Sequence, residues 1–468
     1  MTPARTPEQV AAWLDDHEIR WIRTEGVTID GVMIGKHLHR DKFVGALPTG
    51  TAISEIAYGM DLGGTPYLTW WPSWRRDALG DFVQRPDLDT LVALPGQPGF
   101  AGVLVDHHDL DGAALPVCPR ALLRSVVTRL AAQGYTARAA FEIEGMLFAE
   151  SVDTARRRGY RGLTPMSHAA PIGYSNYNSR QQLAFLDEVV GRLEAIGVGV
   201  EGWHDEAAPG QFELNLVPTG IVTAADHVVR TKQIMREVAL DLGCSVTFMA
   251  KPHDGYGNGL HVHHSLRTID GDEPVCWAPD GFARASDLPP VLAHWLAGIV
   301  ATMPAATSIF APSVNSFRRL VGWAAAPTTA TWAEDNKSTG VRVLSRSPNS
   351  ARIEQRAASG DANPYLVLAA VLAGGLVGLE HQLPLDEPLR VAGWGLPGEG
   401  WPHLPRSITR AADRLADDHH LRSVLGDEFV DHWVESRRWE WLMFHTTGGD
   451  PTATGVTDWE LTRSFELG

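Results

Sequence analysis

The sequence predicts an α+β protein of two unequal domains. Segments in which apolar and polar residues alternate, as they do in strands, are interspersed with longer stretches of helical periodicity. A chain of 468 residues can bury a large core, and its length favours about two domains. The pattern changes after LVDHHDLDGAALPVCP, so we expect a boundary near Gly112, between residues 17–112 and residues 113–468.

Composition and charge argue against several classes of protein. The 40 Lys and Arg residues against 56 Asp and Glu residues give a net charge of −16, without a basic run, which argues against a nucleic-acid partner. Three scattered cysteines are typical of a reduced cytosolic protein and supply no cysteine-based metal site. The N-terminus has no apolar signal core, and no uninterrupted apolar stretch reaches membrane length. The expectation is a cytoplasmic protein without a membrane partner.

The N-terminal region predicts one helix and paired strands. Residues 7–16 follow a Thr-Pro start and predict a short helix, and Ile22–Phe43 alternates around a Gly-rich bend, which predicts two paired strands. Residues 64–77 hold three of the sixteen tryptophans within five positions, between prolines and arginines that favour a loop. Such aromatic residues either join the core or line a pocket, and the sequence favours neither.

The first candidate ligands lie on a predicted strand. A helix over Pro119–Ala132, with Gly134 as its stop, precedes YTARAAFEIEGMLFAE. Glu142 and Glu144 share one face of that strand because successive side chains of a strand alternate. Apolar residues continue the same face, so it is half buried, and paired carboxylates there need a compensating cation.

A predicted hairpin supplies further acids. The amphipathic helix Arg180–Ile196 leads into GVGVEGWHDEAAPGQFELNLVP, with Glu201 near its start. If the Pro-Gly turn makes a hairpin, Glu206 and Glu213 point into one cavity beside the acids of the preceding strand. A helix over Ala224–Asp241 then delivers the chain to Lys251.

The stretch Lys251–Leu266, KPHDGYGNGLHVHHSL, is the one around which the site is organised. A glycine-rich turn enters an alternating segment, where His261, His263 and Ser265 would share one face. The glycines open a strand and not a helix, so we set a dinucleotide-binding fingerprint aside. Histidines on a strand are usually ordinary surface or core residues. The carboxylates elsewhere in the chain make the functional interpretation preferable.

The C-terminal part supplies cations and helices. After a predicted helix over Pro289–Ala305 come Arg319, Lys337 and Arg342, and then ARIEQR, where Glu354 and Arg356 share a strand face. Alternating charges usually mark a solvated face. Together, however, the acids with one imidazole suit Mg²⁺ or Mn²⁺ better than zinc. Two such cations beside arginines make a phosphoryl-transfer site, and without a Walker motif the phosphates must be held by metals and side chains.

These motifs resemble those of the glutamine synthetase family. The motifs that carry the resemblance are FEIEGMLF, EAAPGQFELNL, KPHDGYGNGLHVHHSL, NSFRRL with NKSTGVRV, and ARIEQR with ANPYLVLAAVLAGGL. The similarity covers most of residues 113–468 and is looser over residues 17–110. It implies a small N-terminal β-grasp-like domain and a large catalytic domain with a curved antiparallel sheet and helices.

The resemblance also implies roles for single residues. Two or more Mg²⁺ or Mn²⁺ ions would be held by two sets, Glu144, Glu206 and Glu213 for one ion and Glu142, His261 and Glu354 for another. ATP would contact Glu201, His263, Ser265 and Arg342, with Lys337 where the family has an arginine. Glutamate and the transferred phosphate would contact Gly257, Arg319 and Arg356, the two arginines being the catalytic pair, with Tyr256 and Trp323 beside them.

The departures from the family pattern concern the amine. Ala325 stands where glutamine synthetases carry a flap glutamate, no Asp lies between Asp61 and Asp77, and Tyr256 replaces an asparagine. Ammonium needs a site that attracts a cation and removes a proton, and both acids are missing. We therefore expect an organic amine, in a pocket formed by Trp70, Trp71, Trp74 and Trp323, with Ala324 and Ala325.

The sequence thus predicts an ATP-dependent ligase that makes a γ-glutamyl amide through γ-glutamyl phosphate. The alternatives left open are an ammonia-using glutamine synthetase, a catalytically silent structural relative, and a carboxylate substrate other than glutamate. The resemblance further implies a homo-oligomer built as rings of hexamers.

Overall fold

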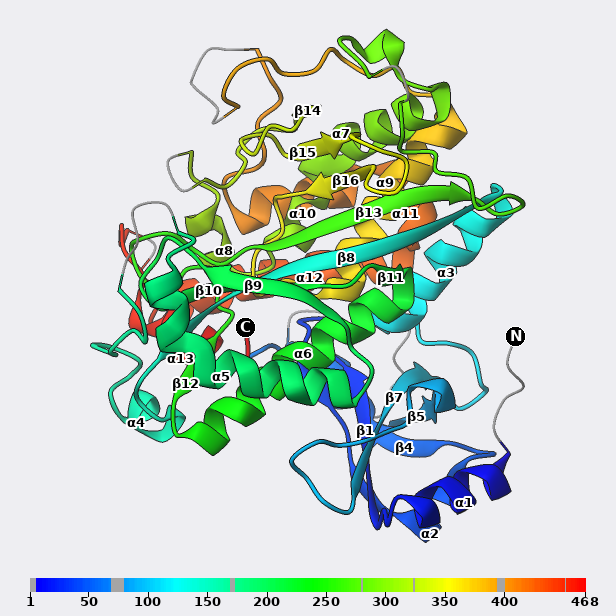
Figure 1. Ribbon diagram of the computed structural model, residues 1–468, viewed down its shortest axis with the longest axis vertical. Helices are drawn as coiled ribbons and strands as arrows, with labels where there is room; N and C mark the ends of the chain where they lie inside the picture. The colour runs from blue at the N-terminus through cyan, green and yellow to red at the C-terminus, as the bar shows by residue number, and fades with distance from the viewer. Residues whose placement is uncertain are drawn as a thin grey trace.

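The computed structural model describes residues 6–68, 80–168, 173–278, 281–322, 325–393, 400–450 and 452–468. Within these ranges the chain forms two β-sheets, of seven and nine strands, with helices packed around them. This is the predicted α+β class. Figure 1 shows the smaller sheet at one end of the elongated molecule and the larger sheet through its middle.

The smaller sheet is built from the N-terminal segment. Its strands follow the order β2-β1-β7-β5-β4, with β3 beside β1 and β6 beside β7. β1 and β7 are parallel, and the other pairs are antiparallel. The strands are β1 (Trp21–Val27), β2 (Met33–Ile34), β3 (His37–His39), β4 (Thr51–Ser54), β5 (Asp81–Pro86), β6 (Val92–Ala93) and β7 (Phe100–His108).

The prediction of paired strands over Ile22–Phe43 is confirmed for β1 to β3, but it is wrong from Arg40 onward. The alternating pattern continues past β3, but the chain turns into the helix α2 (Arg40–Ala46). The side chain of His39 caps this helix, and its buried Phe43 packs in a small core with Val10 and Leu14 of α1 (Pro7–Asp16). Burial of Phe43 in that core therefore outweighs the local strand pattern.

The larger sheet carries the segments singled out in the sequence. Its order is β14-β15-β16-β13-β8-β10-β9, with β11 and β12 also paired to β8. All pairs are antiparallel except β14 with β15. The strands are β8 (Tyr135–Phe148), β9 (Val200–Asp205), β10 (Gln211–Leu216), β11 (Thr219–Gly220), β12 (Ser245–Thr247), β13 (Leu260–Thr268), β14 (Trp332–Glu334), β15 (Val341–Leu344) and β16 (Arg352–Gln355).

The helices of the catalytic part confirm most of the sequence expectations. The predicted helix Pro119–Ala132 is α3 with the same ends, and Gly134 beyond it has φ +86°. The three other predicted helices are present with shifted ends, as α5, α6 and α7. The remaining bounds are α4 (Val152–Arg157), α5 (Asn176–Ala195), α6 (Ile221–Leu242), α7 (Pro290–Phe310), α8 (Val314–Arg319), α9 (Pro364–His381), α10 (Ile408–Asp417), α11 (His419–Leu425), α12 (Asp427–Thr446) and α13 (Asp458–Ser464).

The helices α7 and α9 form the centre of the core. By length and composition alone both helices could cross a membrane, although His294 interrupts the apolar run of α7 and Glu380 lies near the end of α9. Their apolar windows are 72% and 83% buried inside the protein, and the two helices pack closely against each other. Apolar residues all around a helix are typical of a core helix in a large protein. Figure 1 shows α5 running beside β9, and α6 packs between α5, α9 and the central strand β8.

Candidate active site

The acidic half of the site is built by the register of four neighbouring strands. β8 lies in the middle of the larger sheet, where Glu142 is opposite His261 of β13 and Glu144 is opposite Glu213 of β10. Glu213 is in turn opposite His204 of β9. Directly opposite residues point to the same face of a sheet, so this register gathers the five side chains. The predicted hairpin around the Pro-Gly turn is confirmed as β9 and β10.

The basic half is built by the strands on the other side of β13. His263 is opposite Glu354 of β16, and Glu354 is opposite Arg342 of β15. The carboxylate of Glu354 is fully buried and accepts hydrogen bonds from Arg342 Nη1 at 2.9 Å and from Arg356. Arg356 Nε also donates to the backbone oxygen of Lys337 at 3.0 Å. These contacts fix two arginines at the edge of the acidic cluster.

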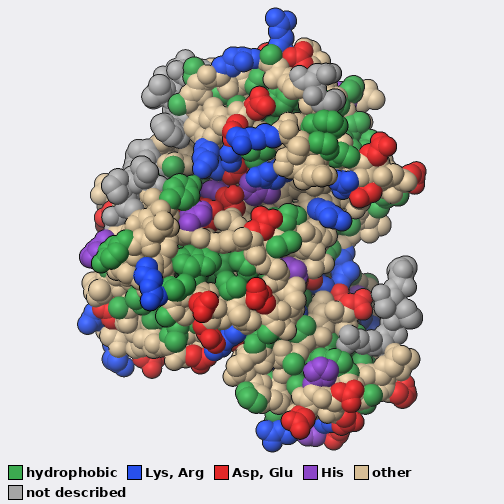
Figure 2. Space-filling view, in the orientation of Figure 1, with side chains coloured by type: hydrophobic (Ala, Val, Ile, Leu, Met, Phe, Trp, Pro, Cys, Tyr) green, Lys and Arg blue, Asp and Glu red, His purple; other side chains and the backbone are tan. Residues whose placement is uncertain are grey.

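Both halves line one cavity of about 840 Å³. Figure 2 shows acidic and histidine side chains in the middle of this face, with Lys and Arg side chains gathered beside them. The residues that line the cavity are Glu142, Glu144, Tyr174, Glu201, Gly202, Trp203, His204, Glu206, Ala207, Gln211, Glu213, Asn215, Tyr256, Gly257, His261, Arg319, Ala325, Lys337, Arg342 and Arg356.

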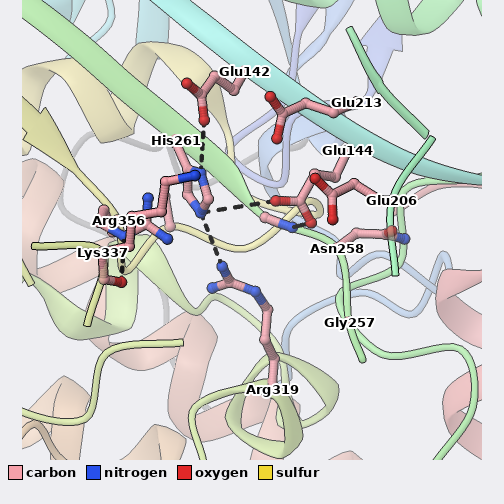
Figure 3. A network of polar contacts seen from close by, with 12 residues as sticks. Glu142, Glu144, Glu206, Glu213, Gly257, Asn258, His261, Arg319, Lys337 and Arg356 are labelled. Atoms are coloured by element: carbon pink, nitrogen blue, oxygen red, sulfur yellow. Dashed lines mark hydrogen bonds and ion pairs between the residues drawn. The ribbon is translucent and has the colours of Figure 1, made fainter. Parts of the chain in front are cut away.

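His261 lies at the junction of the two halves. Its Nδ1 is 3.0 Å from Glu142 Oε2, while its Nε2 faces Glu144 Oε1 at 3.8 Å and Arg319 Nη2 at 3.4 Å (Figure 3). His263 Nε2 is 2.7 Å from the second oxygen of Glu142. Burial alone would raise the pKa of Glu142, but the two imidazoles hold that pKa well below its usual range. Glu142 is therefore ionised at neutral pH.

The other end of the cluster carries excess negative charge. Burial raises the pKa of Glu206 to about 7, and the charges of Glu144 and Glu213 contribute to the rise. Burial alone would lower the pKa of His204, but its hydrogen bond to Glu213 and the charges of Glu213 and Glu206 raise it to about 9. A carboxylate that resists ionisation beside an imidazole that gains a proton indicates excess negative charge, which a divalent cation would neutralise. The donor set of carboxylate oxygens with imidazole nitrogens fits Mg²⁺ or Mn²⁺.

The glycine-rich turn places the backbone against Arg319. A Cβ at Gly257 would lie 2.2 Å from the backbone oxygen of Ala250, so only glycine fits there. Gln211 Nε2 donates to the oxygen of Gly257 at 3.1 Å and to Glu144 Oε2 at 2.9 Å. The Arg319 guanidinium is buried beside this turn, and burial lowers its pKa. A cation held in so little solvent acts strongly on an anion bound in the cavity.

Comparisons with known proteins identify the family. Residues 116–463 match the family described as glutamine synthetase, catalytic domain. The chain belongs to the glutamine synthetase family.

Relatives and a solved structure of this family match nearly the whole chain. The glutamate–isopropylamine ligase of a Pseudomonas species is 30% identical over 466 residues, covering 98% of each chain. The gamma-glutamylethanolamide synthetase of Streptomyces coelicolor is 34% identical over 399 residues, covering 84% of this chain and 81% of that protein. A GmaS structure in complex with ADP has a TM-score of 0.81 at 26% identity, covering 96% of this chain and 98% of that one.

Most of the residues singled out from the sequence lie together. The cavity is lined by five of the six metal-ligand candidates, and the sixth, Glu354, lies directly behind its wall. The cavity is also lined by Gly257, Tyr256, Glu201, Lys337, Arg319, Arg342 and Arg356. His263 also lies behind the wall, through its contact with Glu142. Ser265, a predicted nucleotide contact, is not among the described residues that line the cavity. It lies farther along β13, opposite Arg138.

The structure groups the candidate ligands differently from the two predicted sets. Ligand atoms within 4.8 Å of one another come from three groups of described residues. The groups are Glu142 with Glu213 and His261, Glu142 with His263 and Glu354, and His204 with Glu206 and Glu213. His204 was missed from the sequence, although it lies two positions before Glu206 in the predicted hairpin. The buried Gln211 was missed as well, because nothing local distinguishes it from an ordinary polar residue.

The predicted amine pocket is only partly visible. Trp70, Trp71, Trp74, Trp323 and Ala324 lie outside the described residues. Ala325 is described and lines the cavity, with the left-handed backbone angle φ +56°. Tyr256 is 41% exposed and lines the cavity too.

Proposed function

We propose that the protein is an ATP-dependent ligase that joins the γ-carboxylate of glutamate to an organic amine. The observation that carries this proposal is the single cavity in which Glu142, Glu206 and Glu213 face the cations Arg319 and Arg356. A nucleoside triphosphate binds together with divalent metal ions. The acids are needed to hold the metal ions, and the arginines are needed to hold the phosphates. Membership of the glutamine synthetase family supports the reaction class. So do two relatives, one named a glutamate–isopropylamine ligase and the other a gamma-glutamylethanolamide synthetase.

The substrates and cations would be held by separate parts of the cavity. The proposal assigns two or more Mg²⁺ or Mn²⁺ ions to the acidic cluster, where they would neutralise the phosphates of ATP. Glu201, Lys337 and Arg342, with His263 and Ser265, are the proposed nucleotide contacts. Gly257 and the arginines Arg319 and Arg356, with Tyr256 and Trp323, are the proposed contacts of glutamate and of the transferred phosphoryl group.

The proposed reaction has two steps. A γ-carboxylate oxygen of glutamate attacks the terminal phosphorus of ATP, and ADP leaves. The amine nitrogen then attacks the carbonyl carbon of the acyl phosphate, phosphate leaves, and the nitrogen loses a proton. An acyl phosphate divides a difficult amide synthesis into two feasible steps. Arg319 and Arg356 stabilise the negative charge that develops on the transferring group.

The proposed amine is organic because Ala325 stands where the family pattern has a glutamate. Ala325 lines the cavity and brings no carboxylate to its position. A bare ammonium ion loses its hydration there without gaining a counter-charge. An alkyl or aryl body gains about 25 cal/mol for each Å² of apolar surface it buries.

We also propose a division of the chain at Gly112, a cytoplasmic location and a homo-oligomer. The smaller sheet ends with β7 at His108, and the family match begins at residue 116, which supports the division. The three cysteines are free and buried, as suits a reducing compartment. The ring assemblies of the family support the proposal of an oligomer. Light scattering would measure the mass of that oligomer.

The experiment that tests the reaction follows an oxygen atom. Glutamate labelled with ¹⁸O in its γ-carboxylate is incubated with ATP, Mg²⁺ or Mn²⁺ and a panel of amines. The proposal predicts that one ¹⁸O appears in the released phosphate for each amide formed, because the attacking oxygen leaves with phosphorus. Amide without labelled phosphate would refute the acyl phosphate. No product with any amine or with ammonium would favour the alternative that the protein is a catalytically silent structural relative of glutamine synthetase.

A further inference from the structure

The short helix α8 carries two side chains that contact the same glycine-rich turn. Asn315 and Arg319 are one helical turn apart, so they lie on one face of the helix. Asn315 Oδ1 accepts a hydrogen bond from the backbone N–H of Lys251 at 2.7 Å, and Asn315 Nδ2 donates to the backbone oxygen of Lys251 at 2.9 Å. Arg319 contacts the far end of the turn, where a Cβ at Gly257 would lie 3.3 Å from Arg319 Cγ. The helix thus binds the turn at both ends.

The two ends of the turn are also joined to each other. The backbone N–H of Asn258 donates to the oxygen of Ala250 at 2.8 Å, and Gly257 packs against the same oxygen. Because Ala250 and Lys251 share a rigid peptide bond, a displacement of Lys251 moves the surface on which Gly257 lies. Gly257 and Arg319 both line the cavity, and Figure 3 shows the Arg319 guanidinium directed toward the acidic cluster. The anchoring of Lys251 therefore affects the spacing of two residues that line the cavity.

The position of α8 depends on a buried carboxylate of another helix. With six residues, α8 is too short to be stable alone, so contacts from outside must place it. Glu460 of α13 supplies such a contact, since its Oε1 accepts from Arg318 Nε at 2.6 Å and from Asn315 Nδ2 at 3.0 Å. Glu460 is 1% exposed, and a carboxylate buried to that extent needs its donors. The contact therefore holds both partners on α8 in fixed positions.

The helix α13 is itself held firmly. The second oxygen of Glu460 accepts from the backbone N–H of Thr457 at 2.9 Å, which fixes the carboxylate at the start of its own helix. Arg463, one turn farther along α13, pairs with Glu440 of α12 at 2.7 Å and with Asp61 at 3.0 Å. All three of these side chains are largely shielded from solvent, which strengthens the pairs. A fixed α13 thus supports α8 from outside the cavity.

We propose that Glu460 is a positioning residue for the glutamate-binding part of the site. By holding α8 against the start of the glycine-rich turn, it keeps Arg319 and Gly257 at the spacing that bound glutamate requires. This role rests on the proposed function, which assigns those two residues to glutamate. Glu460 is not among the described residues that line the cavity, so it acts on substrate only through α8 and the turn. The proposed nucleotide contacts lie on other elements, so the effect should fall on glutamate and not on nucleotide.

Binding titrations without turnover test this role. Calorimetry measures the Kd of a non-hydrolysable ATP analogue with Mg²⁺, and then the Kd of glutamate for the protein saturated with that analogue. Glu460→Ala removes both acceptor contacts to α8. We expect it to raise the Kd of glutamate roughly tenfold and to leave the Kd of the analogue within about twofold of the wild type. An unchanged Kd of glutamate, or an equal rise for both ligands, would overturn the proposal.

Two control variants on the same helix separate positioning from loss of stability. Asp458→Ala removes a carboxylate that is 84% exposed and pairs with Arg161 in solvent, so both affinities should stay at the wild-type values. Thr457→Ala removes the hydroxyl that caps α13 but leaves the oxygen of Glu460 that faces α8. It should lower the urea midpoint and leave glutamate binding unchanged. Glutamate binding weakened as much as in Glu460→Ala would mean that any loosening of α13 has this effect, which would overturn the proposal.

A second variant approaches the same contact from α8. If Glu460→Ala does not fold, Arg318→Met replaces it, since the Arg318 side chain is 18% exposed and methionine keeps its apolar stem. The variant loses the donor to Glu460, and glutamate binding should weaken while nucleotide binding does not. Wild-type affinity for glutamate in Arg318→Met would overturn the proposal.

The outcomes separate this role from the proposed function. A wild type that binds glutamate, with a Glu460→Ala variant that binds it equally well, refutes the positioning role and leaves the ligase proposal standing. A wild type that binds the nucleotide analogue but no glutamate refutes the proposed substrate, and the positioning role with it.

Discussion

Arg356 shows how one residue of the site depends on its neighbours. Its guanidinium is 7% exposed and is held by the carboxylate of Glu354 and the backbone oxygen of Lys337. The side chain is therefore fixed before substrate binds, which is the condition for strong stabilisation of developing charge. Arg346, between β15 and β16, has a side chain that is 79% exposed and pairs only with Asp335 among the described residues. The two arginines differ in burial and not in charge.

Replacing Arg356 should therefore affect chemistry and not folding. We expect Arg356→Ala to reduce the kcat of amide synthesis roughly 10²-fold or more, the effect of losing one donor aimed at developing charge. Steady-state kinetics with ADP detection measure it, with circular dichroism as the check on folding. Arg346→Ala should keep its kcat within about twofold, since exposed ion pairs contribute little. Equal kinetics for both variants would mean that Arg356 does not act on the transferring phosphoryl group.

Ala325 offers a direct test of amine selectivity. Its φ of +56° is already tolerated by an L-residue, so Ala325→Glu adds a carboxylate without a new backbone requirement. The acid should attract ammonium, and we expect the ratio of kcat/KM for ammonium to that for a neutral amine to rise about tenfold, which corresponds to about 1.4 kcal/mol. Ala325→Gln has the same shape without the charge and should leave the ratio unchanged. A rise in both variants would point to shape instead of charge.

At the scale of elements, the contact of α7 with α9 supports the sheet that carries the site. Glycines on both helices let their backbones approach closely. A Cβ at Gly378 of α9 would lie 1.9 Å from the backbone oxygen of His294 and 2.8 Å from the nitrogen of Gly298, both on α7. Because these are backbone atoms, no side chain can move aside.

Gly378→Ala should consequently destabilise the protein. We expect a loss of about 1–3 kcal/mol in the free energy of unfolding, the range for overpacking a dense core. Urea denaturation followed by circular dichroism measures it. Gly191→Ala on α5 is the matched control, because nothing lies within 4 Å of the added Cβ and alanine is the better helix former by about 0.5–1 kcal/mol. If Gly378→Ala were as stable as Gly191→Ala, the close approach of the two helices would be refuted.

At the scale of the whole molecule, ion pairs join the N-terminal part, with its smaller sheet, to helices that pack on the larger sheet. Arg120 of α3 is 3% exposed and reaches Asp87 at 2.7 Å, Asp106 at 3.1 Å and Asp226 of α6 at 2.8 Å. Glu25 of β1, which is also buried, pairs with Arg230 of α6 at 2.9 Å. These contacts tie the N-terminal strands to helices of the catalytic part.

The ion pairs predict how stability depends on pH. Burial alone would raise the pKa values of Asp87 and Glu25, but their arginine partners lower both. A lowered pKa contributes stability that is present above the ordinary values of about 4 and is lost as pH falls through the lowered value. We expect the urea midpoint to fall as pH goes from about 5 to 3. Asp87→Asn should flatten this dependence, and an unchanged slope would contradict the role of the pair.

The sequence predicted those parts of the fold and site that depend on local pattern. The ends of α3 follow from Pro119 and Gly134, and the β9–β10 hairpin follows from its Pro-Gly turn. The start of α2 was missed because tertiary burial of Phe43 overrides the alternating pattern. The contacts of His204 were also missed, since the register of β9 on β10 decides which residue stands opposite Glu213.

The most direct test of the central claim is a competition between ammonium and organic amines. The purified protein is given ATP, glutamate and Mn²⁺ with ammonium and one monoamine together, and mass spectrometry measures the ratio of glutamine to γ-glutamyl amide. The absence of an acid at Ala325 predicts at least roughly tenfold more amide than glutamine for one bulkier amine, equivalent to about 1.4 kcal/mol in the competing barriers. Glutamine as the main product against every amine tested would contradict the account.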